Sequence, residues 1–160
     1  MAPTQVEHGA KPGDLIEIFR KGGTYQHWAV YIGEDEVVHL TDPGGDSSSS
    51  GSMGLSLGGI AQVMRHNIWE VIHGDPFKIN NLLDNKYKPR DRDVIVKEAC
   101  GMVGTERQYN VVSLNCEHFA TMLRYGQPES RQVGGAYDYS AYVTHYSINF
   151  SLFVEPIFTN

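Results

Sequence analysis

Two β-type runs separated by a three-residue polar stretch constrain the fold of this chain most strongly. The runs are HWAVYIG at residues 27–33 and VVHL at residues 37–40, and both are rich in the aromatic and β-branched side chains that favour strands. Since only EDE lies between them, we expect Gly33–Glu36 to form a hairpin connection. Another compact β-type run, GDLIEIFR at residues 13–20, precedes the pair. The sequence therefore predicts consecutive antiparallel strands near the N-terminus.

The stretch SLNCEHFATMLRYG, residues 113–126, has the pattern of a short helix. Asn115 is a good N-cap and Gly126 is expected at the C-terminal end. An apolar stripe at i, i+3 and i+4 lies between them: Phe119, Met122 and Leu123. Cys116 takes the first helical position, where unpaired N–H groups and the helix dipole stabilise a thiolate. The position favours a nucleophile, with a small buried hydrophobic residue as the alternative, and a nucleophile also needs a base.

His27 and His39 are candidates for that base. In an antiparallel pair, opposed residue numbers have a constant sum, so these two odd-numbered residues share a face only if the sum is even. An even sum requires an odd-length loop or a bulge. With such a loop His39 opposes Ala29 and lies diagonal to His27, within reach of an imidazole relay. We expect both imidazoles on the Cys116 side. One would accept the thiol proton, and the other would hold the first imidazole in its tautomer and orientation.

The composition excludes several classes of protein. A chain of 160 residues is long enough for one self-supporting domain. The N-terminus has no apolar signal region and two cysteines are too few for a disulfide framework, which together predict a reducing, cytoplasmic setting. Nucleic-acid binding is not expected, because the net charge is −6 and the 13 Lys and Arg residues are scattered. A charge-free stretch near the C-terminus, Tyr139–Val154, is too short for a transmembrane helix.

Other segments give coarser predictions. Short strands are expected at 60–66 and 68–73, a polar turn region at 74–88, and a helix at about 92–103 that ends at Gly104. In that helix Cys100 falls in line with Val96 and Val103, which predicts core packing and no chemistry. A Gly/Ser-rich segment, residues 41–59, is expected to be a loop. Residues 128–160 form a tail of uncertain structure that is rich in Tyr and Phe.

Several motifs resemble a known family when they are taken together. They are KPGDLIEIFR, YQHWAVYIG, VVHL, INN, VG and LNCEHFATMLRYG, in this order along residues 11–127. They are similar to the lecithin:retinol acyltransferase-like family, in its branch of HRAS-like suppressor, phospholipase A and acyltransferase enzymes. The resemblance implies an α+β fold in which an antiparallel sheet packs against helices, as a circularly permuted NlpC-type papain-like fold. It makes residues 11–127 the catalytic domain and residues 128–160 a C-terminal tail.

The resemblance also implies the chemistry of the site. It assigns Cys116 as nucleophile, His27 as general base and His39 as the orienting residue, with Tyr25 weakly indicated near the oxyanion. Cys116 would attack a fatty-acyl ester of a glycerophospholipid and form a thioester. Water, the amine of phosphatidylethanolamine or a lysophospholipid would then accept the acyl group. No cofactor or metal is implied, and protein partners are unknown.

Two departures from the family and three alternatives remain. The mixed tail replaces an apolar membrane anchor, and the Gly/Ser-rich loop replaces an apolar stretch. We therefore expect transient, peripheral membrane contact through Met53, Leu55, Leu57 and Ile60, or else a plain linker. A metal site is disfavoured, since Cys116 and His118 would point about 200° apart on a helix. A non-catalytic interaction protein and a cysteine peptidase or amidase stay open.

Overall fold

An antiparallel sheet forms the centre of the computed structural model, which describes residues 7–20, 26–41, 59–109 and 115–130. Six strands pair in the order β5-β1-β2-β3-β4-β6 within these residues. The strands are β1 (Leu15–Phe19), β2 (Gln26–Gly33), β3 (Glu36–Thr41), β4 (Gly59–Asn67), β5 (Phe77–Ile79) and β6 (Glu106–Tyr109). The helices are α1 (Ile68–Ile72), α2 (Arg92–Met102) and α3 (Cys116–Tyr125). The predicted α+β class is confirmed, and its relation to a permuted NlpC-type fold stays a prediction.

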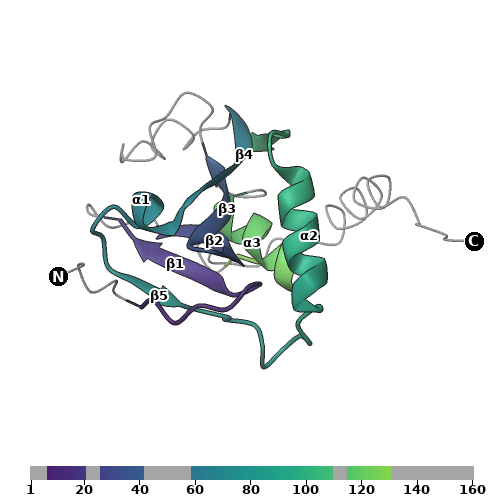
Figure 1. Cartoon of the computed structure of the whole chain (residues 1–160). Coiled ribbons are helices and arrows are strands. Elements are labelled where there is room, and N and C mark those ends of the chain that lie inside the picture. Colours follow the sequence, from purple (N-terminus) through teal and green to yellow (C-terminus); the bar gives the residue numbers. More distant parts are fainter. Residues whose placement is uncertain (1–6, 21–25, 42–58, 110–114, 131–160) are drawn as a thin grey trace, which may run out of the picture.

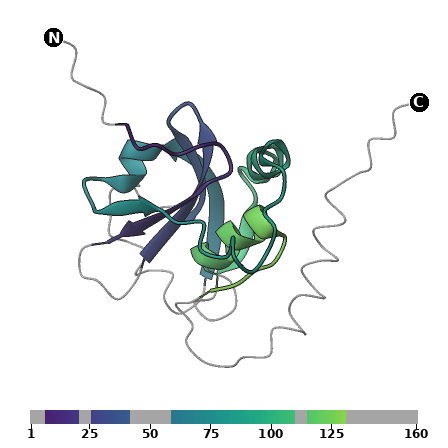
Figure 2. The same ribbon diagram turned by 90° about the horizontal axis from the view of Figure 1, so that it is seen from below.

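The sheet is covered on both faces, because its strands alternate between two apolar clusters. Helices α2 and α3 lie on one side and α1 on the other (Figures 1 and 2). The first cluster joins strand residues to α2 and α3: Leu15, Trp28, Val30, Val38, Leu40, Ala61 and Val63, with Ile95, Ala99, Phe119 and Leu123. The second joins strand residues to α1: Ile16, Ile18, Ala29, Tyr31 and Val37, with Ile68, Val71 and Ile72. Successive strand residues thus contact different helices, as the period of two requires.

The hairpin between β2 and β3 contains a bulge. Gly33 pairs with Glu36, whereas the next ladder pair is Tyr31 with Val37, so β2 carries one extra residue there. Gly33 has φ 100°, and the turn residues Glu34 and Asp35 have φ 53° and 57°. The predicted register, in which the numbers of opposed residues have an even sum, is confirmed, because Ala29 lies opposite His39. A two-residue turn with a bulge produces it.

Residues 68–73 were predicted as a strand, and this prediction was wrong. Ile68–Ile72 form a short helix, α1, in which the Asn67 side chain accepts a hydrogen bond from the Trp69 N–H. Its buried residues are Ile68, Val71 and Ile72, the i, i+3 and i+4 spacing of a helix face. β-branched composition had favoured a strand, and the N-cap with this spacing outweighs it.

The two outer strands, β5 and β6, were not predicted. β5 lies inside the expected turn region and pairs with β1, while β6 pairs with β4. Both are short and carry charges, such as Lys78 and Arg107, which is typical of edge strands. Their sequences show little alternation of apolar and polar residues, which is the pattern that would have predicted a strand.

Helix α2 runs as predicted, but its buried face differs by one position. The buried residues are Ile95, Ala99 and Met102. Val103, expected in the core, is 38% exposed, and Cys100 is half-buried. Cys100 is therefore at the flank of the packed face, and its prediction as core filler was wrong.

Several predictions concern residues outside the described part. Tyr25, Met53, Leu55 and Leu57 lie there, as do residues 131–160. Ile60, at the start of β4, is described and is 55% exposed. The proposed boundary at residue 127 stays a prediction. Within the described residues no helix has the length and apolar character needed to cross a bilayer.

The strained hairpin turn predicts a stabilising substitution. Glu34 is exposed and has φ 53°, a left-handed conformation that asparagine adopts more readily than glutamate. We expect Glu34→Asn to raise the free energy of unfolding by about 0.5 to 1 kcal/mol in urea denaturation. Glu106→Asn makes the same chemical change at an exposed position of strand β6 and should not stabilise the protein. Equal effects of the two substitutions would contradict the strain argument.

Candidate active site

The N-terminus of α3 is closed by its own side chains. Asn115 accepts hydrogen bonds from the N–H groups of Glu117 and His118, at 2.9 and 3.0 Å. The His118 ring returns the interaction, since its Nδ1 accepts from the Asn115 N–H at 3.2 Å. This reciprocal pair is a capping box with histidine at the third helical position. The predicted N-cap is confirmed, Cys116 is the first residue of the helix, and His118 makes a structural hydrogen bond.

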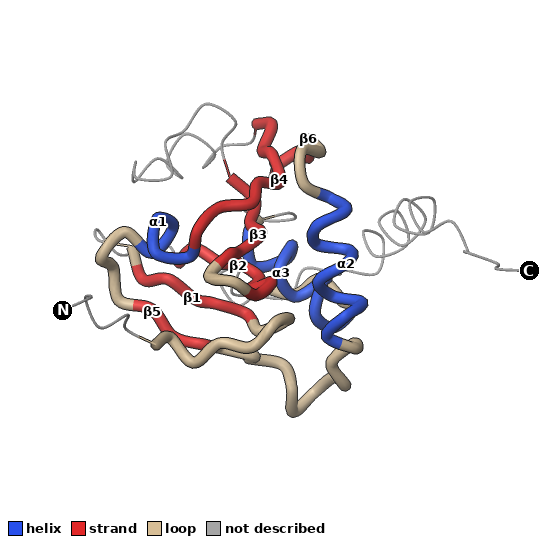
Figure 3. Tube along the Cα trace, in the orientation of Figure 1, coloured by secondary structure: helices blue, strands red, loops and turns tan. Residues whose placement is uncertain are grey.

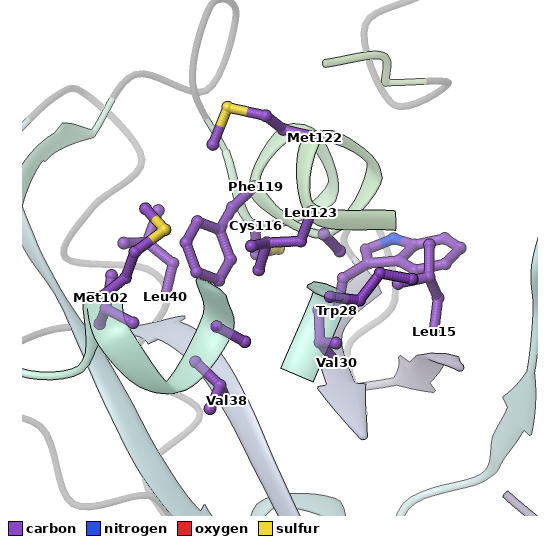
Figure 4. Close-up of a cluster of buried hydrophobic side chains, with 14 of the residues drawn as sticks. Leu15, Trp28, Val30, Val38, Leu40, Met102, Cys116, Phe119, Met122 and Leu123 are labelled. Carbon is purple, nitrogen blue, oxygen red and sulfur yellow. The ribbon is translucent and has the colours of Figure 1, made fainter. Parts of the chain in front are cut away.

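Helix α3 is buried on every side, beyond the single apolar stripe predicted. All ten of its residues are buried, and Cys116 is 1% exposed. Figure 4 shows Cys116 in the cluster with Phe119 and Leu123 of the same helix and with Trp28 and Val30 of β2. The Cys116 thiol donates toward the carbonyl oxygen of Gln26 at 3.6 Å. The sulfur thus lies beside the start of β2, next to the residue before His27.

Three histidines from three adjacent strands form a continuous hydrogen-bonded chain. His27 Nε2 lies 2.8 Å from His39 Nδ1, and His39 Nε2 lies 2.8 Å from His66 Nδ1. The rings meet edge to face, with interplanar angles of 88° and 68°. His27 and His39 are both buried, whereas His66 of β4 is half-buried. Of the two ring nitrogens of His27, Nδ1 takes no part in these two hydrogen bonds.

The position of the thiol relative to these rings follows from the sheet. Opposed residues share a face, so His39 lies on the face of Ala29, which carries α1. Cys116 approaches from the other face, where α3 packs. The β2–β3 ladder has its last pair at Ala29 and His39, and both Gln26 and His27 lie beyond it. The thiol meets β2 at this end, and the expected position of both imidazoles on its side stays a prediction.

Burial keeps the imidazoles of His27 and His39 neutral. It lowers the pKa of His27 to about 3, with a smaller contribution from the positive charge of Arg20. Burial also lowers the pKa of His39 well below its usual range, and His27, His66 and Arg20 add to the effect. A neutral imidazole carries one proton and one acceptor nitrogen. The hydrogen-bonded histidines are therefore able to accept a proton. An isolated positive charge on one of the buried rings would cost free energy.

The C-terminal end of α3 is held by a separate polar cluster. Arg124 donates to both carboxylate oxygens of Asp84, at 3.0 and 2.9 Å, and to the carbonyl oxygen of Gly13 at 2.9 Å. The Tyr125 hydroxyl donates to Asp84 at 2.7 Å. Burial alone would raise the pKa of Asp84, but hydrogen bonds from Arg124 and Tyr125 lower it below the ordinary value. These contacts fix α3 against β1 and the segment that follows β5.

His66 is the site residue that sequence reasoning missed. It is the last residue of a predicted strand, and its register with Val37 puts it on the same face as the other two histidines. Once β3 and β4 are paired, Val37, the partner of His66, lies two residues from His39, but the connection between these strands gave no register in the sequence. No three His, Cys, Asp or Glu side chains of the described ranges are grouped so as to hold a metal ion.

Comparisons with known proteins identify the family of this chain. Residues 8–129 match the family model for lecithin retinol acyltransferase. The chain is 48% identical to human phospholipase A and acyltransferase 4 over 127 residues, which cover 77% of this chain and 74% of that protein. It is 38% identical to human phospholipase A and acyltransferase 1 over 133 residues, 83% of this chain and 78% of the relative. Identity to rat phospholipase A and acyltransferase 5 is 44% over 123 residues, 77% of this chain but only 42% of that longer protein.

The neutral, buried histidines predict a loss of stability in mild acid. In the unfolded chain they protonate below about pH 6.5, whereas in the folded protein burial lowers the pKa of His27 to about 3 and of His118 to about 4. The unfolded state then binds more protons, so stability is greatest above pH 6.5 and falls below it. Each such histidine removes up to about 1.4 kcal/mol per pH unit.

Urea denaturation at pH 7, 6 and 5 measures this slope. We expect the slope to be smaller in His39→Gln, which removes one of the buried histidines. A free energy of unfolding that is the same at pH 7 and pH 5 would show that the imidazoles ionise in the folded state as they do in the unfolded chain.

Proposed function

Because the chain belongs to the lecithin retinol acyltransferase family, we propose that it is a thiol-dependent phospholipase A and acyltransferase. Its substrates are glycerophospholipids, from which it removes one fatty acyl group. The single observation that carries this proposal is the thiol of Cys116 at the start of α3, 3.6 Å from the carbonyl oxygen of Gln26, the residue before the buried, hydrogen-bonded His27. The names of the relatives supply the substrate class.

Cys116 is the proposed nucleophile and His27 the proposed base. The thiol proton passes to Nδ1 of His27, since Nε2 of this ring is already hydrogen bonded to His39 at 2.8 Å. The S–H bond breaks and an imidazolium forms beside the thiolate. The first-turn position of Cys116 supports the thiolate through the helix dipole. The attraction between the two charges offsets the cost of an imidazolium at a buried site.

His39 is the proposed orienting residue. Its Nδ1 accepts from Nε2–H of His27, which holds the base in the tautomer with a bare Nδ1. In this role His39 needs only an acceptor at the right place. An amide side chain can supply one, less well placed.

The thiolate attacks the ester carbonyl and the oxyanion is stabilised by hydrogen-bond donors. The backbone N–H of Cys116, at the N-terminus of α3, is one proposed donor. Tyr25 stays a weaker proposal, because the structure does not describe it. The lysophospholipid leaves with a proton from His27, and the acyl group remains on sulfur as a thioester. Water, the amine of phosphatidylethanolamine or a lysophospholipid hydroxyl then attacks the thioester and releases the thiol.

Substitution of the nucleophile tests the mechanism. We expect Cys116→Ser to lower both hydrolysis and acyl transfer by at least about 100-fold, since a hydroxyl beside this base stays protonated. His39→Gln should retain about a tenth of the activity, because the amide still orients His27 in part. Purified protein is incubated with labelled phosphatidylcholine, with and without phosphatidylethanolamine, and products are identified by mass spectrometry.

Cys100→Ser is the matched control, since Cys100 is a half-buried cysteine of α2 outside the proposed site. It should retain the activity of the parent protein. Equal loss in both cysteine variants would indicate a folding defect. An inactive parent protein that still binds the vesicles would favour the non-catalytic alternative, and cleavage of a peptide or amide substrate alone would favour the peptidase.

A peripheral membrane contact is proposed at the segment before β4. A lipid ester must leave the bilayer to reach a buried thiol, and a chain with net charge −6 gains little from anionic lipids. Ile60, with 55% of its surface exposed, continues the apolar series that begins with Met53, Leu55 and Leu57 in the sequence. An exposed apolar side chain at this place supports an interfacial role.

Removal of the apolar side chains tests this contact. We expect Leu55→Ser combined with Leu57→Ser to weaken binding to phosphatidylcholine vesicles several-fold and to slow hydrolysis of vesicular substrate. Hydrolysis of a soluble short-chain ester should stay unchanged. Val94→Ser, at another exposed apolar position, on α2, is the control. Unchanged vesicle binding in the double variant would assign the segment to a linker.

A further inference from the structure

His66 extends the histidine pair to a chain of three, and its role follows from counting protons. Each neutral imidazole has one N–H, and each of the two hydrogen bonds in the chain holds one proton. Only two arrangements satisfy both bonds. In the first, every ring carries its proton on Nδ1, and protons are donated from His66 toward His27. In the second, every ring carries its proton on Nε2, and protons are donated from His27 toward His66.

Only the second arrangement permits the proposed chemistry. With the proton on Nε2, His27 has a bare Nδ1 that can accept the proton of a thiol. In the first arrangement Nδ1 of His27 is already protonated and cannot act as a base. The Nε2–H tautomer is also the commoner form of a neutral histidine side chain in water, which favours the second arrangement for all three rings.

We propose that His66 is a positioning residue for the base, His27. Nδ1 of His66 accepts from Nε2–H of His39 and thereby keeps Nδ1 of His27 free of a proton. The part of this inference that concerns catalysis rests on the proposed function. The arrangement of protons on the three rings depends only on the folded protein. His66 also gives the chain a half-buried end, where its own Nε2–H can reach solvent.

The surroundings of His27 and His39 disfavour a positive charge, so an acceptor such as His66 at the end of the hydrogen-bonded series is useful. His27 and His39 are buried, and Arg20 adds a positive charge that disfavours a cation on either ring. When His27 takes the thiol proton, both hydrogen bonds keep the direction that they already have. The positive charge is then stabilised by two aligned dipoles, those of His39 and His66, without reorientation of any ring.

The proton positions can be observed directly in the full-length protein. Nitrogen-15 NMR of histidine-labelled protein at neutral pH reports which nitrogen of each ring is protonated. We expect bare Nδ1 and protonated Nε2 for His27, His39 and His66. In His66→Leu, which removes the acceptor, a protonated Nδ1 should appear on His27. Protonated Nδ1 on His27 in the parent protein would overturn the proposal, whatever the activity.

Kinetics of three variants complete the test. His66→Leu should lower kcat about 10-fold with little change in KM, and His66→Asp, which can only accept at this position, should recover most of the loss. His73→Asn removes an exposed histidine at the end of α1 and should keep the parent kcat. Equal loss in His66→Leu and His66→Asp, with both folded by circular dichroism, would overturn the positioning role.

The two proposals fail in different ways. If the parent protein shows no thiol-dependent turnover, the proposed function fails while the NMR result still decides the proton arrangement. If Cys116→Ser abolishes turnover but the spectra show protonated Nδ1 on His27, the inference about His66 fails and the proposed function stands.

Discussion

The register of the β2–β3 hairpin is the constraint on which the rest of the site depends. A slip of one residue would transfer every side chain of β3 to the other face. Without the extra residue near Gly33, His39 would lie opposite Val30 and share a face with Trp28, against α3. The bulge instead puts His39 opposite Ala29, two residues from His27. The turn accepts left-handed backbone at Glu34 and Asp35, and the Asp35 carbonyl oxygen is held by the Ile68 N–H at 2.7 Å.

Burial of three polar rings in a row would be destabilising if their nitrogens lacked partners. Here the two hydrogen bonds of 2.8 Å satisfy both nitrogens of His39, which is 2% exposed. The low-polarity surroundings strengthen these bonds, and burial also keeps the His27 and His39 rings neutral. The same environment that makes the site costly in acid thus keeps His27, the proposed base, unprotonated at neutral pH. Stability in acid and readiness for proton transfer are opposite consequences of one burial.

Local signals in the sequence were sufficient for the parts of the fold that local chemistry determines. The N-cap Asn115, the C-cap Gly126 and the short hairpin were all predicted from adjacent residues and are confirmed. The failures are where tertiary pairing decides. The helix α1 has a β-branched sequence, and edge strands β5 and β6 form because β1 and β4 offer them unpaired backbone. The α2 face was misplaced by one residue for the same reason, since only packing against the sheet selects Ile95 over Val96.

The site itself divides in the same way. Cys116, His27 and His39 each lie in a segment with a strong local pattern, so the sequence identified them as candidates. His66 joins them through the β3–β4 register, and the connection between those strands is a long Gly/Ser-rich segment, not a short hairpin turn that would set the register. Its addition depends on Val37 lying opposite His66, a pairing of residues far apart in the chain.

Helix α3 connects these distant contributions to the thiol, because it is fixed at both ends. At its C-terminal end Arg124 binds Asp84 and the Gly13 carbonyl oxygen, which ties the helix to the segment after β5 and to the segment before β1. At its N-terminal end the Asn115 and His118 box fixes the first turn, and Cys116 contacts the backbone of β2. The tube in Figure 3 shows this helix packed along the strands. A helix held in this way cannot rotate about its axis without breaking an ion pair or its cap, so the sulfur keeps its place at the start of β2. The position of the proposed nucleophile is thus set by contacts at the far end of the helix as well as by its immediate neighbours.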